Sequence, residues 1–113
     1  MTNHPALPAE VIRAFHLMWD KFPGPVTLVH RSRLVMAANP VAVSLDREPG
    51  VKCSQLPPAS AHAGCLGNKT LDEGRAQLKL AVTPEYQRMV YWVPIEGYPE
   101  YFLHFSTALS DQA

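Results

Sequence analysis

The chain has little of what secreted, membrane-spanning or nucleic-acid-binding proteins need. Only two of its 113 residues are cysteine, too few for the disulfide framework of a small secreted domain. No apolar run approaches the ~20 residues that a membrane-spanning helix requires, and the first 25 residues lack the pattern of a signal peptide. We therefore expect a cytoplasmic protein with no membrane partner.

An excess of charge of one sign is also lacking. Ten basic and ten acidic residues cancel, and no basic block occurs. Because nucleic-acid binding depends largely on cationic side chains that neutralise phosphates, we expect no nucleic-acid partner. The sequence contains no G-x-S-x-G, P-loop or H-E-x-x-H pattern, so we expect no enzyme. A neutral chain has little self-repulsion, which permits association between copies.

What the chain does have is the composition of one globular domain, spanning 1–113. Hydrophobic residues make up 47% of it and charged residues 18%. Residues 8–22 carry apolar side chains at helical spacing, which predicts an amphipathic N-terminal helix. The tripeptide Pro23-Gly24-Pro25 ends this helix, and the core of the domain follows over about 26–109.

Short β-prone runs predict five strands, at residues 26–30, 33–38, 76–82, 86–95 and 100–109. Asn39 and Pro40 are suited to cap and begin a short helix over 40–45, and a second short helix is expected over 68–73. Short turns between the strands favour antiparallel neighbours. The predicted fold class is α+β: a five-stranded antiparallel sheet, with the N-terminal amphipathic helix and the short helices gathered on one face.

The stretch 34–42, Leu-Val-Met-Ala-Ala-Asn-Pro-Val-Ala, resembles the PAS pattern in which the second strand ends in Asn and a short helix opens directly after it. Gly50 is similar to the glycine that follows that helix. Val93-Pro94-Ile95 with Gly97 resembles the late PAS strand that ends in a proline and turns at a glycine. Over residues 8–109 the order of elements resembles a PAS domain, a small sensory or docking module. Profilin-like and roadblock-like domains are the alternative, because they share a similar order of elements.

This resemblance implies a small-molecule pocket between the inner sheet face and the short helices, with an ordinary filled core as the alternative. The pocket candidates are Leu28, Val35, Leu45, Leu56, Leu66, Leu78, Leu80, Met89, Tyr91, Phe102 and His104. PAS-like domains often pair through the N-terminal helix and the outer sheet face, which implies a homodimer that signals to a separate effector protein. The interface candidates, which would form one exposed aromatic face, are Phe15, Trp19, Phe22, Tyr86, Val90, Trp92, Tyr101, Leu103 and Phe105.

Three soft side chains lie within thirteen residues: Cys53, His62 and Cys65. Thiolate and imidazole suit a metal, although the spacing is not C-x2-C. A disulfide between the two cysteines would add about 3 kcal/mol in the chain-entropy model. Two incidental thiols are the favoured interpretation, and a redox or metal sensor is the alternative. The haem attachment motif C-x-x-C-H is absent and nothing resembles the cysteine context of flavin-binding PAS domains, so no cofactor is favoured.

Overall fold

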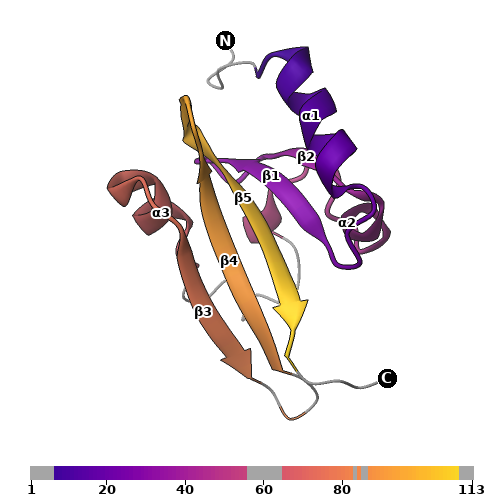
Figure 1. Cartoon of the computed structure of the whole chain (residues 1–113), viewed down its shortest axis with the longest axis vertical. Coiled ribbons are helices and arrows are strands. Elements are labelled where there is room, and N and C mark those ends of the chain that lie inside the picture. The colour runs from indigo at the N-terminus through magenta and orange to yellow at the C-terminus, as the bar shows by residue number, and fades with distance from the viewer. Residues whose placement is uncertain (1–6, 56–64, 83, 85–86, 110–113) are drawn as a thin grey trace.

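The structure is a computed structural model that describes residues 7–55, 65–82, 84 and 87–109. Its strands are β1 Val26–His30, β2 Val35–Ala38, β3 Gln77–Val82, β4 Gln87–Ile95 and β5 Tyr98–Ala108. Its helices are α1 Ala9–Trp19, α2 Pro40–Ser44 and α3 Gly67–Glu73, with one 3-10 turn, η1, at Cys53–Gln55. The strands form one antiparallel sheet in the order β2-β1-β5-β4-β3 (Figure 1). The predicted α+β class is confirmed.

The first hairpin differs in one detail from the sequence prediction, because β2 begins at residue 35 instead of 33. Arg33 has a φ of 79°, in the left-handed region, and its N–H donates to the carbonyl of His30. A residue in that conformation cannot continue a strand. The turn is therefore longer than the predicted Arg31-Ser32 dipeptide.

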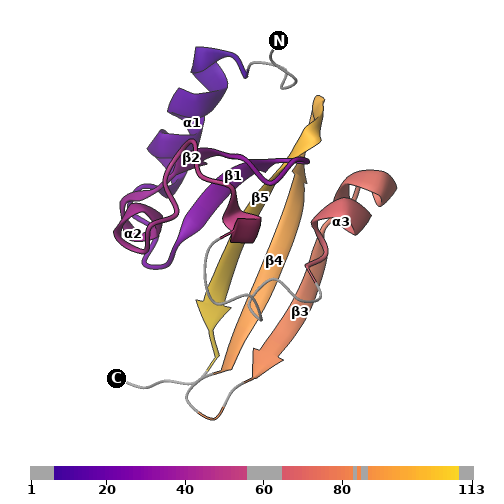
Figure 2. The same cartoon turned by 180° about the vertical axis from the view of Figure 1, so that it is seen from behind.

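The sheet is covered on two sides, because the helices do not all lie on one face. Helix α1 packs on what we call the outer face, where Phe15 of the helix meets Val26 and Leu28 of β1. Helix α3 packs on the opposite, inner face, where its Leu71 joins Val29 of β1 in a second cluster. Figures 1 and 2, which view the sheet from opposite sides, show α1 lying apart from α3 and η1. The prediction that α1 joins the short helices on one face is therefore wrong. It failed because β1 is buried along its whole length, so burial does not alternate along this strand.

The side chain of Asn39 is hydrogen-bonded to three segments of the chain. Its Oδ1 accepts hydrogen bonds from the backbone N–H groups of Val26 and Ala42, both at 3.0 Å. Its Nδ2 donates to the carbonyls of Trp19 at 3.0 Å and Gly24 at 2.9 Å. The side chain is completely buried. The bond to Ala42 confirms the predicted N-cap of α2, and the other three join α2 to the end of α1 and the start of β1.

The β4–β5 hairpin contains a shift in register. At its tip Ile95 pairs with Tyr98, but the next pair along the sheet is Pro94 with Phe102. The pairing has therefore moved by three residues. Because side chains alternate between faces, a shift by an odd number exchanges the faces of one strand relative to the other. Pro94 has no N–H to contribute to the ladder at this irregularity.

This shift overturns the predicted grouping of the aromatic residues. The predicted four-residue turn over 96–99 would have placed Val90 and Trp92 on the same face as Tyr101, Leu103 and Phe105. In the structure Trp92 lies opposite His104, and Tyr91 lies opposite Phe105. The two separated runs are Val90 and Trp92 on the inner face, and Tyr101, Leu103 and Phe105 on the outer face.

Candidate ligand site on the inner face

The inner face has an apolar floor built from three strands. Val29 of β1, Trp92 of β4 and Phe102 of β5 are all nearly or completely buried, and Leu71 of α3 closes over them. Half-buried Cys53 packs at the edge of the same cluster. The floor exists because these positions alternate along their strands with the outer-face residues. It is the surface on which α3 and η1 lie.

An aromatic pair extends this floor along β4 and β5. The rings of Trp92 and His104 are stacked, with centroids 5.0 Å apart and an interplanar angle of 22°. His104 Nδ1 lies 3.1 Å from the carbonyl oxygen of Tyr91. Since a carbonyl only accepts, this contact assigns the proton of neutral His104 to Nδ1. The imidazole is thereby fixed against the indole.

Two polar atoms are buried in this apolar setting without a hydrogen-bond partner among the described residues. They are Trp92 Nε1 and Thr70 Oγ1. Trp92 is only 5% exposed and Thr70 is completely buried. Thr70 precedes Leu71 in α3, and Leu71 packs in the same cluster as Trp92. Each unsatisfied buried group costs about 1–3 kcal/mol, so the fold is less stable by about this amount for each atom until a hydrogen-bonding partner reaches it.

A cation lies at the edge of the same surface. The guanidinium carbon of Arg33 is 5.5 Å from the centre of the Phe102 ring, within the range of a cation–π contact. Arg33 Nη1 donates to the carbonyl of Arg31 at 2.7 Å and to Oδ1 of Asn68 at 3.3 Å. A Cβ on Gly67, the first residue of α3, would lie 2.9 Å from Phe102 and 3.0 Å from Arg33. Only glycine lets the helix begin this close to both side chains.

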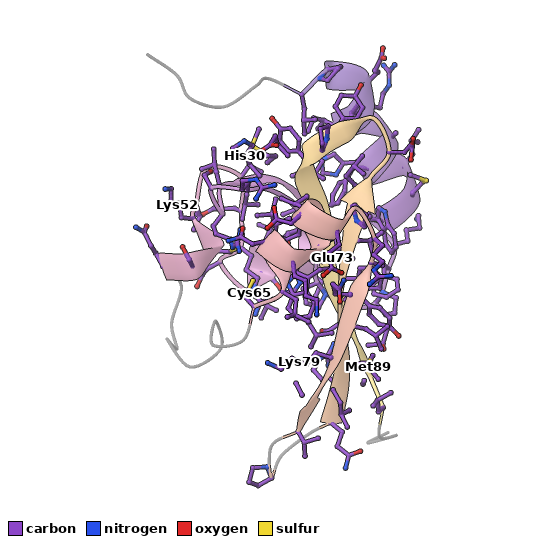
Figure 3. All side chains as sticks on the ribbon, turned by 90° about the vertical axis from the view of Figure 1, so that its left-hand side faces the viewer. His30, Lys52, Cys65, Glu73, Lys79 and Met89 are labelled. Carbon is purple, nitrogen blue, oxygen red and sulfur yellow. The ribbon has the colours of Figure 1, made fainter. Side chains whose placement is uncertain are left out.

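Cys53 and Cys65 flank the start of α3 as free thiols. Burial raises the pKa of the Cys53 thiol, Cys65 raises it further, and the positive charges of Arg33 and Arg47 act against this rise. Cys65 is exposed, and its Sγ accepts from the N–H of Gly67 at 3.5 Å. Figure 3 shows Cys65 and Glu73 at opposite ends of α3, with Lys79 and Met89 farther along β3 and β4.

The metal or redox group that the sequence raised as an alternative falls only partly within the described residues. His62 lies outside them. No three His, Cys, Asp or Glu side chains come together in the part of the chain that the structure describes. A role for Cys53 and Cys65 in redox sensing stays a prediction.

The predicted pocket residues fall on both faces of the sheet. Those on or beside the inner face are Val35, Leu66, Phe102 and His104. Those on the outer face are Leu28, Leu78, Leu80, Met89 and Tyr91. Leu45, after α2, is 50% exposed, and Leu56 lies outside the described residues. Leu78, Leu80, Met89 and Tyr91 were grouped with Phe102 because the choice ignored the register shift between β4 and β5. Leu28 pairs with Leu103, on the opposite face from Phe102.

The predicted interface residues divide in a similar way. Phe15, Trp19, Phe22, Tyr101, Leu103 and Phe105 form an aromatic and aliphatic cluster under α1. Phe15 is only 4% exposed and Tyr101 only 2%, so the packing of α1 occupies both side chains. Val90 and Trp92 belong to the inner face, and Tyr86 is outside the described residues.

The outer face instead leaves a different apolar strip uncovered. Leu78, Leu80 and Val82 of β3 are 57%, 50% and 57% exposed. Leu78 lies opposite Tyr91, whose ring stacks on Phe105 at a centroid distance of 4.9 Å. The strip therefore continues the outer face beyond the area under α1, where β3, β4 and β5 extend past the helices (Figures 1 and 2).

Two site residues were missed from the sequence, Thr70 and Arg33. Neither belongs to a motif, and a threonine within a short polar helix gives no signal of burial. A shallow hollow of about 260 Å³ was missed as well. It lies between the end of α3 and the β4–β5 hairpin, and Leu71, Pro94 and Pro99 are among its lining residues.

No family model matches the sequence, and no curated protein matches it. Solved structures do match the fold. A domain of an HTR-like protein from Haloarcula marismortui is similar over 78% of this chain and 99% of its own, with 14% identity and a TM-score of 0.65. A sensory box sensor histidine kinase from Vibrio cholerae is similar over 90% of this chain and 92% of its own, with 13% identity and a TM-score of 0.65.

The receptor VqmA from Vibrio cholerae is similar over 96% of this chain, with 19% identity and a TM-score of 0.63. This chain spans about half of VqmA, 54% of its length. Solved structures of VqmA include a dimer, a complex with DPO and a complex with ligand and DNA. No helix in the described residues is both long and apolar enough to cross a bilayer. Together with the strand order β2-β1-β5-β4-β3, these likenesses show that the chain has a PAS-like fold.

Proposed function

We propose that the chain is a non-catalytic PAS-type sensory module that binds a small molecule on the inner face of its sheet, beneath α3. One observation carries this proposal. Trp92 Nε1 and Thr70 Oγ1 are buried there without a partner among the described residues. A ligand that accepts from the indole N–H would recover about 1–3 kcal/mol that the free protein forgoes. The apolar surroundings favour a compact ligand with few polar atoms.

The solved structures lend support of a general kind. They include a sensor histidine kinase and a VqmA complex with DPO. We propose that this chain shares sensing by small-molecule binding with such proteins. The DNA in the VqmA complex is not part of the proposal, because this chain has a net charge of zero and no basic block.

The proposal is tested by comparing two tryptophan variants. Trp92→Phe removes the inner-face N–H and keeps an aromatic ring, whereas Trp19→Phe makes the same change under α1. We expect native mass spectrometry or a thermal-shift screen of metabolites to identify a ligand for the wild type. We also expect the Trp19→Phe variant to retain its thermal shift and the Trp92→Phe variant to lose most of it. Equal shifts in both variants, or no ligand for the wild type, would contradict the proposal.

A homodimer is the second candidate, and the exposed strip Leu78, Leu80 and Val82 on edge strand β3 favours it. An edge strand with exposed apolar residues is prone to pair with another chain. We propose that the strip contributes to self-association. Leu80→Lys should then convert a dimer to a monomer in sedimentation velocity, whereas Leu17→Lys, at an 81% exposed position on α1, should not. A wild-type monomer at high protein concentration would refute this idea.

A further inference from the structure

We propose that the ligand of the inner face is a small aromatic carboxylate, and that Arg33 binds its carboxylate group. This inference rests on the proposed function and adds the chemical class of the ligand. It follows from which hydrogen-bonding groups of the site are satisfied and which are not.

The charge of Arg33 has no counter-ion among the described residues. Its neighbour Arg31 forms ion pairs with two nearby carboxylates, Glu100 at 2.9 Å and Asp72 at 3.1 Å. Among the described residues, the Arg33 guanidinium bonds only to neutral oxygens, the carbonyl of Arg31 and the side chain of Asn68. A half-buried guanidinium without an anion is stabilised less than one with an anion.

The guanidinium also has donors that make no hydrogen bond in the described part of the chain, although Nη2 lies close to Gly67. Both of its hydrogen bonds use Nη1, while Nε and Nη2 make none with described residues. The Nε–Nη2 edge presents two parallel N–H groups, the fork that matches the two oxygens of a carboxylate. Arg33 can therefore donate to a carboxylate from Nε and Nη2 without giving up its present bonds.

Phe102 connects this cation to the unsatisfied groups of the inner face. Its ring lies beneath Arg33, and the same side chain packs in the cluster that holds Trp92. Helix α3 begins against both Arg33 and Phe102 at Gly67, and it carries Thr70 one turn later. The arginine, the threonine and the tryptophan thus surround the contact between α3 and β5.

The unsatisfied groups call for acceptors. Arg33 and Trp92 can only donate, and Thr70 can do both. Burial raises the pKa of Cys53, at the edge of the same cluster, while the positive charges of Arg33 and Arg47 act in the opposite direction. A ligand that complements this site has acceptor oxygens with negative charge and a flat apolar body for the aromatic floor. An aromatic carboxylate has both.

The experiment compares acids with their neutral amides. Binding of benzoate, phenylacetate and indole-3-acetate is measured by calorimetry or by protein-observed NMR, beside benzamide, phenylacetamide and indole-3-acetamide. For the wild type we expect at least one acid to bind about tenfold or more tightly than its amide, because a charged hydrogen-bond pair contributes that much or more. Raising the salt concentration should weaken the binding of the acid and leave the binding of the amide unaffected.

Variants locate the effect. Arg33→Gln should weaken the binding of the acid by about 10–100-fold and that of the amide little. Arg75→Gln, at an exposed arginine, should change neither affinity. Arg33→Asn is the second variant if the first does not fold, since asparagine tolerates the left-handed backbone at this position. Trp92→Phe should weaken acid and amide alike.

Three outcomes overturn the inference. If amides bind as tightly as acids, or if Arg33→Gln leaves acid binding unchanged, the ligand is not recognised through its charge, and the proposed function stands without this refinement. If no acid in the panel binds, the inference also fails. The proposed function is then judged separately, by whether native mass spectrometry and the metabolite screen find any ligand at all.

Discussion

Asn39 is the residue whose replacement should destabilise the fold most for its size. Asn39→Ala removes four hydrogen bonds at once, two to backbone N–H groups and two to backbone carbonyls. The side chain is completely buried, so the backbone groups it leaves have poor access to water. At about 1 kcal/mol for each bond, we expect a loss of about 3–5 kcal/mol, against a total stability of about 5–15 kcal/mol for a domain.

The assay is urea unfolding followed by circular dichroism, with a thermal scan beside it. A loss of that size corresponds to a drop in Tm of about 12–20 °C for a chain of this length. Asn39→Ser separates the contributions, because a serine hydroxyl can still cap α2 at Ala42 but is too short to donate to both Trp19 and Gly24. We expect it to lose about half as much.

Ser44→Ala is the matched control, since Ser44 makes an exposed local bond to the carbonyl of Val41. Its effect should stay within about 0.5 kcal/mol. A loss below about 1 kcal/mol for Asn39→Ala would refute the reasoning, because it would mean that water or backbone rearrangement satisfies the four groups. An equal loss for the serine and alanine variants would show that the cap is not a separate contribution.

Three further predictions concern the site. Gly67→Ala should cost about 1–3 kcal/mol, since its Cβ would lie 2.9 Å from Phe102, while Asn68→Ala, at the exposed next position, should cost less in the same urea titration. Cys65 should react with iodoacetamide before Cys53, because Cys65 is exposed and burial raises the pKa of Cys53; equal rates at pH 8 by mass spectrometry would contradict this. That raised pKa also means that neutral Cys53 stabilises the fold below the ordinary thiol pKa, about 8.5, and that this contribution disappears as pH rises through the folded-state value. Wild type should therefore lose more stability than Cys53→Ala between pH 7 and pH 10, and parallel curves would argue against it.

Much of the fold could be predicted because its signals are local. The spacing of apolar residues before Pro23 indicated α1, and Asn39 with Pro40 located the start of α2. Cleanly alternating residues indicated β3, and short turns indicated antiparallel neighbours. These features need only a few consecutive residues, and the structure contains all of them.

The faces could not be predicted because they depend on one irregular turn. Val90 and Trp92 face the inner side because the pairing of β4 with β5 shifts by three residues between Ile95 and Pro94. The residue preferences in this hairpin do not determine the size of such a shift. The burial of Thr70 and the position of Arg33 follow from how α3 meets β5. Such contacts join distant segments of the chain, so no local pattern predicts them.

The order of the strands has a consequence for how the protein is made. Strand β5 lies at the centre of the sheet and pairs with β1, so that Val26 lies beside Phe105. On a ribosome, the β1–β2 and β3–β4 hairpins emerge before β5, the strand that holds them together. During synthesis the two hairpins therefore lack a shared core, and completing the sheet requires closing a loop of most of the chain. We therefore expect slow folding for a domain of this size.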